Sequence, residues 1–145
     1  MIHGICFMIW KEVMLEGKVI LIVDDDPALL EMYTERLKAE GAIVLEAKDG
    51  EEAVAMVRED HPNLILLDIM MPKKNGFEVL RELSKDQDAN NIPVIILSAL
   101  ADDLKKQEGM GAGAVDYVVK AETLPIDVIE KVRKVLAETE NIGEI

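Results

Sequence analysis

Short apolar runs alternate with longer amphipathic stretches from residue 18 to residue 138, and this alternation is the feature that most constrains the fold. The first run, 18–23 (KVILIV), is rich in β-branched residues and apolar almost throughout, as expected for a strand buried on both faces of a sheet. In the next stretch, 27–40, apolar residues recur at helical spacing, and Asp26 before Pro27 is a typical helix start. The same reasoning predicts strands over 43–47, 64–67, 94–97 and 116–119, and helices over 51–60, 77–85, 102–110 and 126–138.

Five strands that alternate with five helices predict an α/β fold, with a parallel sheet between layers of helices. We expect a single domain over residues 17–140, an N-terminal extension over 1–16 and a C-terminal tail over 141–145. The extension is apolar, but it lacks the basic start and the cleavage site of a signal peptide. We expect it to be dispensable. Two explanations for its presence compete: a wrongly assigned upstream start codon, or a short amphipathic anchor.

The charge balance excludes some classes of partner. The chain has 29 Asp and Glu against 16 Lys and Arg, a net charge of −13. Nucleic acids and anionic membranes bind basic surfaces, so we expect neither as a partner. Cys6 is the single cysteine, which rules out an internal disulfide, and no apolar run is long enough to span a membrane. These features favour a reducing, cytoplasmic location.

Polar residues stand at the ends of four of the predicted strands. In chain order they are Asp24, Asp25, Asp26, Asp68, Ser98 and Lys120. Because open parallel sheets bind ligands outside the carboxyl ends of their strands, we expect these residues to share one crevice. Crowded carboxylates repel one another, and Mg²⁺ removes that repulsion because it takes oxygen ligands. A carboxylate can also act as a nucleophile and form an aspartyl phosphate, while a metal, a lysine and a hydroxyl stabilise the transferring group.

The chain resembles the receiver domain of two-component response regulators, from Lys18 to about Ala137. Four pieces, each at a strand end, carry the resemblance: Val23-Asp24-Asp25-Asp26, Leu67-Asp68-Ile69-Met70-Met71-Pro72 with Gly76, Ile96-Leu97-Ser98-Ala99, and Asp116-Tyr117-Val118-Val119-Lys120. The resemblance implies a flavodoxin-like, doubly wound, five-stranded parallel sheet in the order 2-1-3-4-5, as in the chemotaxis regulator of this family.

The resemblance also implies a role for each acidic residue of the site. Asp68 would be the phosphoacceptor. Asp25 and Asp68 would bind Mg²⁺ directly, together with the main-chain carbonyl of Met70. Asp24 would act near the metal through a water molecule.

Three further residues receive roles from the same resemblance. Ser98 would hydrogen-bond the phosphoryl group, Lys120 would pair with it, and Tyr117 would be the switching aromatic residue. The family usually follows its lysine with proline, often in a cis bond, whereas this chain has Ala121. Because a cis bond before any other residue costs about 2.5–4 kcal/mol, we expect a trans bond here.

The implied function is a signalling switch and not an enzyme. A sensor histidine kinase or a phosphotransfer protein would phosphorylate Asp68, and the added charge would draw Ser98 and Lys120 inward and shift a pre-existing equilibrium. With no output domain expected, the signal would pass to an unknown downstream protein or through a homodimer. One alternative is a phosphorylation-independent interaction module. Another is a hydrolase, disfavoured because its usual signature has a second Asp where this chain has Met70.

Purely structural roles compete with the functional ones at several positions. Ser98 could cap the helix that follows it. Lys120 could be an ordinary surface lysine, and Tyr117 could be simple packing. The pair Met70-Met71 is more typical of core filling than of a ligand site.

Two expectations concern stability and lifetime. The fourth predicted helix should be the least stable element, because Gly109 and Gly111 lie near its end and each costs about 1 kcal/mol relative to alanine. Loss of a phosphoryl group needs a water placed in line opposite Asp68. The residues that flank this approach in the family are here Met70 and Leu100, both apolar, so we expect a long-lived phosphorylated state.

Overall fold

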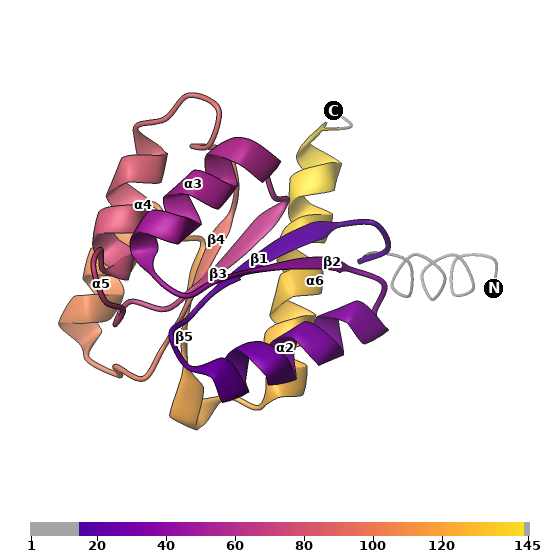
Figure 1. The fold of residues 1–145 in the computed structure, drawn as a ribbon, viewed down its shortest axis with the longest axis horizontal. Helices are drawn as coiled ribbons and strands as arrows, with labels where there is room; N and C mark the ends of the chain where they lie inside the picture. The colour runs from indigo at the N-terminus through magenta and orange to yellow at the C-terminus, as the bar shows by residue number, and fades with distance from the viewer. Residues whose placement is uncertain (1–14, 144–145) are drawn as a thin grey trace.

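A five-stranded parallel sheet forms the centre of the fold, with its strands in the order β2-β1-β3-β4-β5 (Figure 1). The computed structural model describes residues 15–143. The strands are β1 (Val19–Val23), β2 (Ile43–Ala47), β3 (Leu64–Leu67), β4 (Val94–Ser98) and β5 (Asp116–Val119). Between and after them lie α2 (Pro27–Ala39), α3 (Gly50–Asp60), α4 (Gly76–Ser84), α5 (Asp103–Gly111) and α6 (Pro125–Gly143). The predicted fold class and strand order are confirmed.

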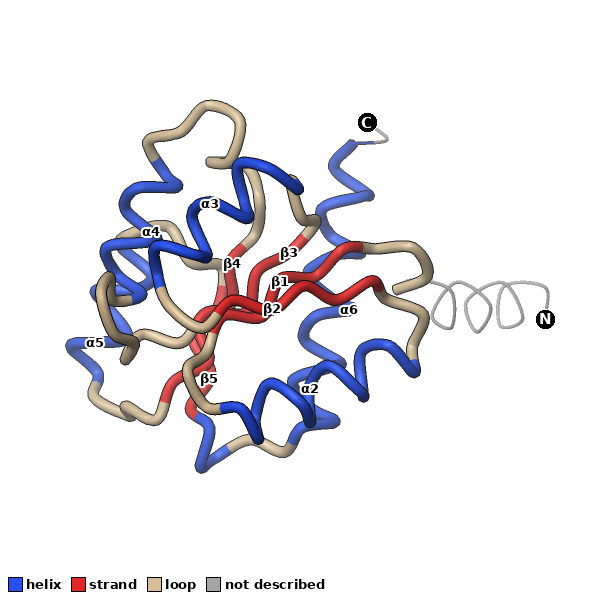
Figure 2. The backbone as a smooth tube through the Cα atoms, viewed as in Figure 1, coloured by secondary structure: helices blue, strands red, loops and turns tan. Residues whose placement is uncertain are grey.

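The helices cover both faces of the sheet, α2 and α6 on one and α3, α4 and α5 on the other (Figure 2). Successive residues of β1 point to opposite faces: Ile20 and Ile22 pack towards α2 and α6, and Leu21 and Val23 towards α3 and α4. All four are at most 1% exposed. Burial on both faces explains why the strand is continuously apolar rather than alternating.

Most element boundaries differ from the predicted ones by one residue at most. Two differences are larger: a 3₁₀ helix, η1 (Lys120–Glu122), follows β5 directly, and α6 continues to Gly143, into the predicted tail. The sequence did not predict η1, because a helix of three residues is too short to show a periodic pattern. In the part of the chain that the structure describes, no helix is long and apolar enough to cross a membrane.

Leu15 belongs to the core, although the sequence places it in the N-terminal extension. Its side chain is 1% exposed and packs on the face covered by α2 and α6. The Lys18 N–H donates to the Leu15 carbonyl (3.1 Å), and the Gly17 N–H donates to the Gly41 carbonyl (3.1 Å). The packed domain therefore includes Leu15, and the preceding part of the extension, residues 1–14, lies outside the described residues.

A glycine brings α5 against the sheet. Gly109 is buried, and a Cβ at this position would lie 2.5 Å from Cδ1 of Ile96 and 3.4 Å from Cδ2 of Tyr117. Glycine thus permits a close approach of the helix to β4 and β5. Leu104 on the same helix is 72% exposed. α5 therefore buries little apolar surface, and its low stability stays a prediction.

Candidate functional site

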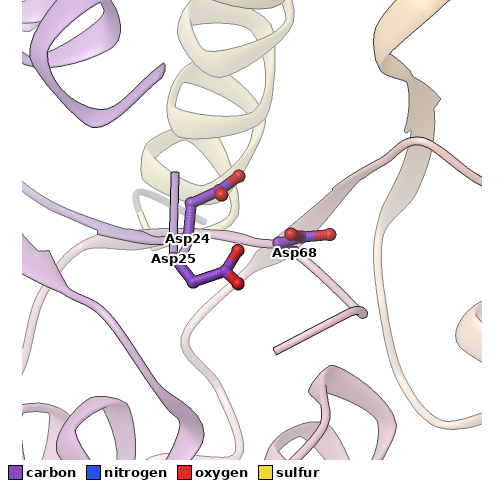
Figure 3. Close-up of side chains that lie close together, drawn as sticks. All are labelled: Asp24, Asp25 and Asp68. Carbon is purple, nitrogen blue, oxygen red and sulfur yellow. The ribbon is translucent and has the colours of Figure 1, made fainter. Parts of the chain in front are cut away.

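Polar side chains gather at the carboxyl end of the sheet, where β1, β3, β4 and β5 end. Asp24, Asp68 and Ser98 are buried there, at 2%, 5% and 0% exposure, and Asp25 is exposed. Carboxylate oxygens of Asp24, Asp25 and Asp68, one from each, lie within 4.8 Å of one another. Figure 3 shows the first two beside the end of β1, with Asp68 across from them. The structure thus brings Asp68 to Asp24 and Asp25, which stand 44 and 43 positions before it in the sequence.

Asp26 does not belong to this acidic group. Its side chain accepts a hydrogen bond from the Ala28 N–H (3.0 Å) and caps α2, as predicted. The Asp26 N–H donates to Oδ1 of Asp24 (2.9 Å), and the Asp24 N–H donates to the Ala47 carbonyl (3.0 Å). These bonds fix the turn from β1 into α2, and with it the backbone that carries Asp24 and Asp25.

Lys120 brings a positive charge to the acidic group. Its Nζ lies 2.8 Å from Oδ2 of Asp24 and 3.5 Å from Oδ2 of Asp68, and its side chain is 23% exposed. The alternative that Lys120 is an ordinary surface lysine is therefore wrong. The bond between Lys120 and Ala121 is trans, as expected.

The titration of the site follows from burial and from these charges. Burial raises the pKa of the Asp68 carboxyl above its usual value, Lys120 opposes this effect, and the Asp24 carboxylate adds to it. Burial alone would lower the pKa of Lys120, but its hydrogen bond to Asp24 and the charge of Asp68 outweigh burial and raise that pKa. Three carboxylates face one ammonium within the described site, which leaves an excess of negative charge where a divalent cation would bind.

Ser98 and Tyr117 both bond to the loop between β4 and α5. Oγ of Ser98 accepts from the Leu100 N–H (3.1 Å), and the Tyr117 hydroxyl donates to the Leu100 carbonyl (2.8 Å). α5 is capped by Asp102, whose side chain accepts from the Leu104 N–H (2.7 Å), so the alternative that Ser98 caps this helix is wrong. Sequence reasoning missed the junction at Leu100, because a main-chain carbonyl leaves no signature in a sequence.

Met70 lies at the rim of the site. Its N–H donates to Oδ1 of Asp68 (3.2 Å), and its side chain is 58% exposed. The prediction that Met70 fills the core is therefore wrong, because the loop after β3 turns its side chain to the surface. Met71 is partly buried against the core under α3 and α4. Together with Phe77 and Leu100, both methionines line a cavity of about 580 Å³ beside the site.

The donor set fits a hard divalent cation. Three carboxylates supply the oxygen ligands that Mg²⁺ prefers, and they are close enough to share one ion. Oδ1 of Asp68 accepts from the Met70 N–H, and Oδ2 lies 3.5 Å from Nζ of Lys120, an arrangement in which a carboxylate can act as a nucleophile. Such a site can hold a metal and a phosphoryl group side by side.

Comparison with known proteins identifies the family. The chain matches the model of the response regulator receiver domain over residues 20–133. It is 43% identical over 124 residues to the probable transcriptional regulator ycf27 of Cyanophora paradoxa, a match that covers 86% of this chain and 50% of that protein. It is 39% identical over 121 residues to protein PilH of Pseudomonas aeruginosa, covering 81% of this chain and 97% of PilH. The chain thus spans about half the length of the first relative.

Solved structures agree with this result. A CheY-like receiver domain protein from Methanospirillum hungatei superposes with a TM-score of 0.82 at 33% identity, covering 88% of this chain and 100% of that one. The receiver domain of the Francisella response regulator 1452 gives 0.79 at 31% identity, covering 85% and 99%. Fold and acidic site together define a flavodoxin-like receiver domain. The chain belongs to the response regulator receiver domain family.

Proposed function

We propose that the chain is a phosphoacceptor switch of a two-component system. A sensor histidine kinase or a phosphotransfer protein would transfer a phosphoryl group to Asp68. Asp25, Asp68 and the main-chain carbonyl of Met70 would hold Mg²⁺, with Asp24 acting through a water molecule. The observation that carries this proposal is the meeting of three carboxylates and the Lys120 ammonium at the end of the sheet. A module that is never phosphorylated has no need of buried, mutually repelling charges, which destabilise a fold.

Asp68 would act as the nucleophile. One of its oxygens attacks the phosphorus, the bond between phosphorus and the donor atom breaks, and the donor keeps the electron pair. Lys120, whose Nζ already lies 3.5 Å from Oδ2 of Asp68, neutralises charge on the transferred group. Bound Mg²⁺ would neutralise further charge on the phosphoryl oxygens. Because Asp68 is 5% exposed, few waters screen these interactions.

Ser98 and Tyr117 would pass the change to the surface. The Ser98 hydroxyl can rotate and donate to a phosphoryl oxygen, and a move of Ser98 towards that group breaks its bond to the Leu100 N–H. Tyr117 holds the carbonyl of the same residue, so its position changes with the loop. Phosphorylation would thereby shift an equilibrium between two arrangements of the β4–α5 loop.

We further propose that the signal leaves through a downstream protein or a second copy of the chain. The match to PilH covers 97% of that protein, so a relative of about this length exists, and this supports signalling through protein contacts. The match to ycf27 of C. paradoxa covers only 50% of that protein. Comparing the proteins captured by the phosphorylated and the unphosphorylated chain tests the proposal. Identical capture, together with identical sedimentation of the two forms, would contradict it.

The experiment that separates the functional classes is labelling by a small phosphodonor, with and without Mg²⁺. One stable phosphoryl group per chain supports the switch, many turnovers support a hydrolase, and no label supports an interaction module. Asp25→Asn should lose most of the label. Asp26→Asn is the matched control and should label normally, because Asp26 caps α2 and asparagine caps equally well.

A further inference from the structure

Met70 lies in the loop between β3 and α4, residues 69–75, here called the site loop. The base of this loop is closed by the Gly76 N–H, which donates to the Ile69 carbonyl (2.9 Å). A Cβ at Gly76 would lie 2.5 Å from the carbonyl oxygen of Asp68, so a side chain does not fit there without moving the backbone of Asp68. The base of the site loop is therefore fixed to the end of β3.

The tip of the site loop is a strained turn. The Lys74 N–H donates to the Pro72 carbonyl (2.8 Å), which closes the turn around Lys73. Lys73 has a φ of 68°, in the left-handed region that residues other than glycine, asparagine and aspartate rarely adopt. A turn in such a conformation persists only where contacts from outside hold it.

The outside contact comes from the first residue of α3. A Cβ at Gly50 would lie 2.1 Å from the carbonyl oxygen of Lys74 and 2.6 Å from its Cβ, both far inside van der Waals distance. The φ of Gly50 is not positive, so its backbone does not itself require glycine. Crowding against the tip of the site loop is what excludes a side chain at this position.

Two ion pairs hold the same tip. Nζ of Lys73 lies 3.6 Å from Oδ2 of Asp49, the residue that caps α3, and Nζ of Lys74 pairs with Glu82 on α4. Lys73 is 60% exposed, so its pair contributes little. The Lys74–Glu82 pair is less exposed, at 26% and 33%, but it holds only the end of a long side chain. The contact at Gly50 acts on the main chain of Lys74 itself and is therefore the more rigid constraint on the tip.

We propose that Gly50 is a positioning residue for the metal ligand at Met70: by lacking a side chain, it lets the site loop rest on the start of α3 and so sets where the Met70 carbonyl lies. Met70 sits between a base fixed to β3 and a tip fixed by Gly50. Moving the tip outward moves the segment between them. The inference rests on the proposed Mg²⁺ site and adds a residue from a separate helix to it.

Titration of the full chain with Mg²⁺, followed by calorimetry, tests this positioning role. Gly50→Ala should weaken Mg²⁺ binding at least tenfold. Gly111→Ala is the matched control and should bind as the wild type does, because Gly111 also lies in a helix but has nothing within 4 Å of an added Cβ. If the wild type does not bind Mg²⁺, the proposed metal site fails. If it binds and Gly50→Ala binds equally well, only the role of Gly50 fails.

A second variant separates positioning from general damage to α3. Lys73→Gly relaxes the left-handed turn, so the double variant Gly50→Ala, Lys73→Gly can move its tip aside and should recover at least threefold in Mg²⁺ affinity. Damage confined to α3 would not be rescued from the site loop. An affinity of the double variant no better than that of Gly50→Ala would overturn the proposal.

The wild-type protein gives a readout that does not depend on whether the variants fold. In amide NMR spectra, the Gly50 and Lys74 signals should shift with Mg²⁺ at the same dissociation constant as the Met70 signal. The Gly111 signal should stay in place. Gly50 and Lys74 signals that do not respond, beside a Met70 signal that does, would contradict coupling between α3 and the metal ligand.

Discussion

The interior of the sheet and its carboxyl end are both buried, but the interior is apolar and the carboxyl end is acidic. In the interior, Leu21 of β1 and Leu66 of β3 are 0% and 1% exposed among apolar neighbours. At the ends of the same two strands, Asp24 and Asp68 are almost as buried, at 2% and 5%, but they are acidic. Burial stabilises the first pair and carries a free-energy cost for the second unless a counter-charge is present.

This difference separates stability from function along each strand. The apolar positions hold the layers together, and their contacts are complete in the protein alone. The acidic positions have only Lys120 as counter-charge in the described structure. A bound metal or an added phosphoryl group should therefore change the free energy of the acidic site more than that of the apolar interior. Substitutions in the two regions should therefore have opposite signs for stability.

The largest expected effect on stability lies in the interior. Leu66→Ala should lower the free energy of unfolding by about 2–5 kcal/mol, since it leaves a cavity on the face of the sheet that α2 and α6 cover. Urea unfolding measures this. Leu104→Ala is the control, because Leu104 is 72% exposed and should change stability by less than about 0.5 kcal/mol. Similar losses in both variants would break the distinction between interior and surface.

At the site, the apolar rim should slow loss of the phosphoryl group. The exposed side chain of Met70 and that of Leu100 line the cavity beside Asp68, and neither can orient an attacking water. The double variant Met70→Asn, Leu100→Glu should lose the label about 10 to 100 times faster, on the order of 1.4–2.8 kcal/mol in barrier height. The decay rate of labelled protein in Mg²⁺ measures it. Equal decay of variant and wild type would show that these side chains do not control the water.

Without Mg²⁺, Asp68→Asn should change stability by less than Leu66→Ala does, and in the opposite direction. Burial raises the pKa of Asp68, so the ionised carboxylate destabilises the folded protein at neutral pH. Removing the charge should raise the free energy of unfolding by about 0.5–2 kcal/mol, the usual range of stabilising substitutions. Added Mg²⁺ should reduce the difference, because it stabilises the wild type. A variant less stable than the wild type would contradict the charge argument.

The difference in the free energy of unfolding between Asp68→Asn and the wild type should depend on pH in a definite direction. Because the folded pKa of Asp68 lies above the unfolded value of about 3.9, the protonated carboxyl favours folding. Its contribution is complete below the unfolded pKa and is lost as the pH rises through the folded pKa. The stability gap between Asp68→Asn and the wild type should therefore close in acid. A gap that widens on acidification would contradict a raised pKa.

The smallest expected effect is a difference in local stability between two helices, α5 and α6. α5 meets the sheet through Gly109 and leaves Leu104 exposed, whereas α6 buries Val128, Ile129 and Val132. Native-state hydrogen exchange should show lower protection in α5 than in α6. Equal protection in the unphosphorylated protein would show that glycine packing anchors α5 as firmly as an apolar face.

Much of the fold was predictable from the sequence, because buried parallel strands are continuously apolar and their helices are amphipathic. The strand ends also indicated where Asp24, Asp25 and Asp68 would meet. Leu15 was placed outside the domain, since a single leucine two residues before a glycine carries no periodic signal, yet it is 1% exposed.

Details that depend on tertiary packing were not predictable. The exposed side chain of Met70 follows from how the site loop turns, and a methionine pair gives no sign of that. The bond from the Tyr117 hydroxyl to the Leu100 carbonyl joins residues 17 positions apart. The contact between Gly50 and Lys74 depends on how α3 packs beside the site loop. The last two features involve main-chain carbonyls, which every residue has, so the sequence gives no sign of them.

The most direct test of the central claim is to map the label of the small phosphodonor by mass spectrometry. In Mg²⁺, one phosphoryl group should appear on the peptide that carries Asp68, and chelation of Mg²⁺ should prevent it. The Asp68→Asn protein should fold and remain unlabelled. A label on another residue, or labelling of Asp68→Asn as strong as that of the wild type, would contradict the assignment of Asp68 as the phosphoacceptor.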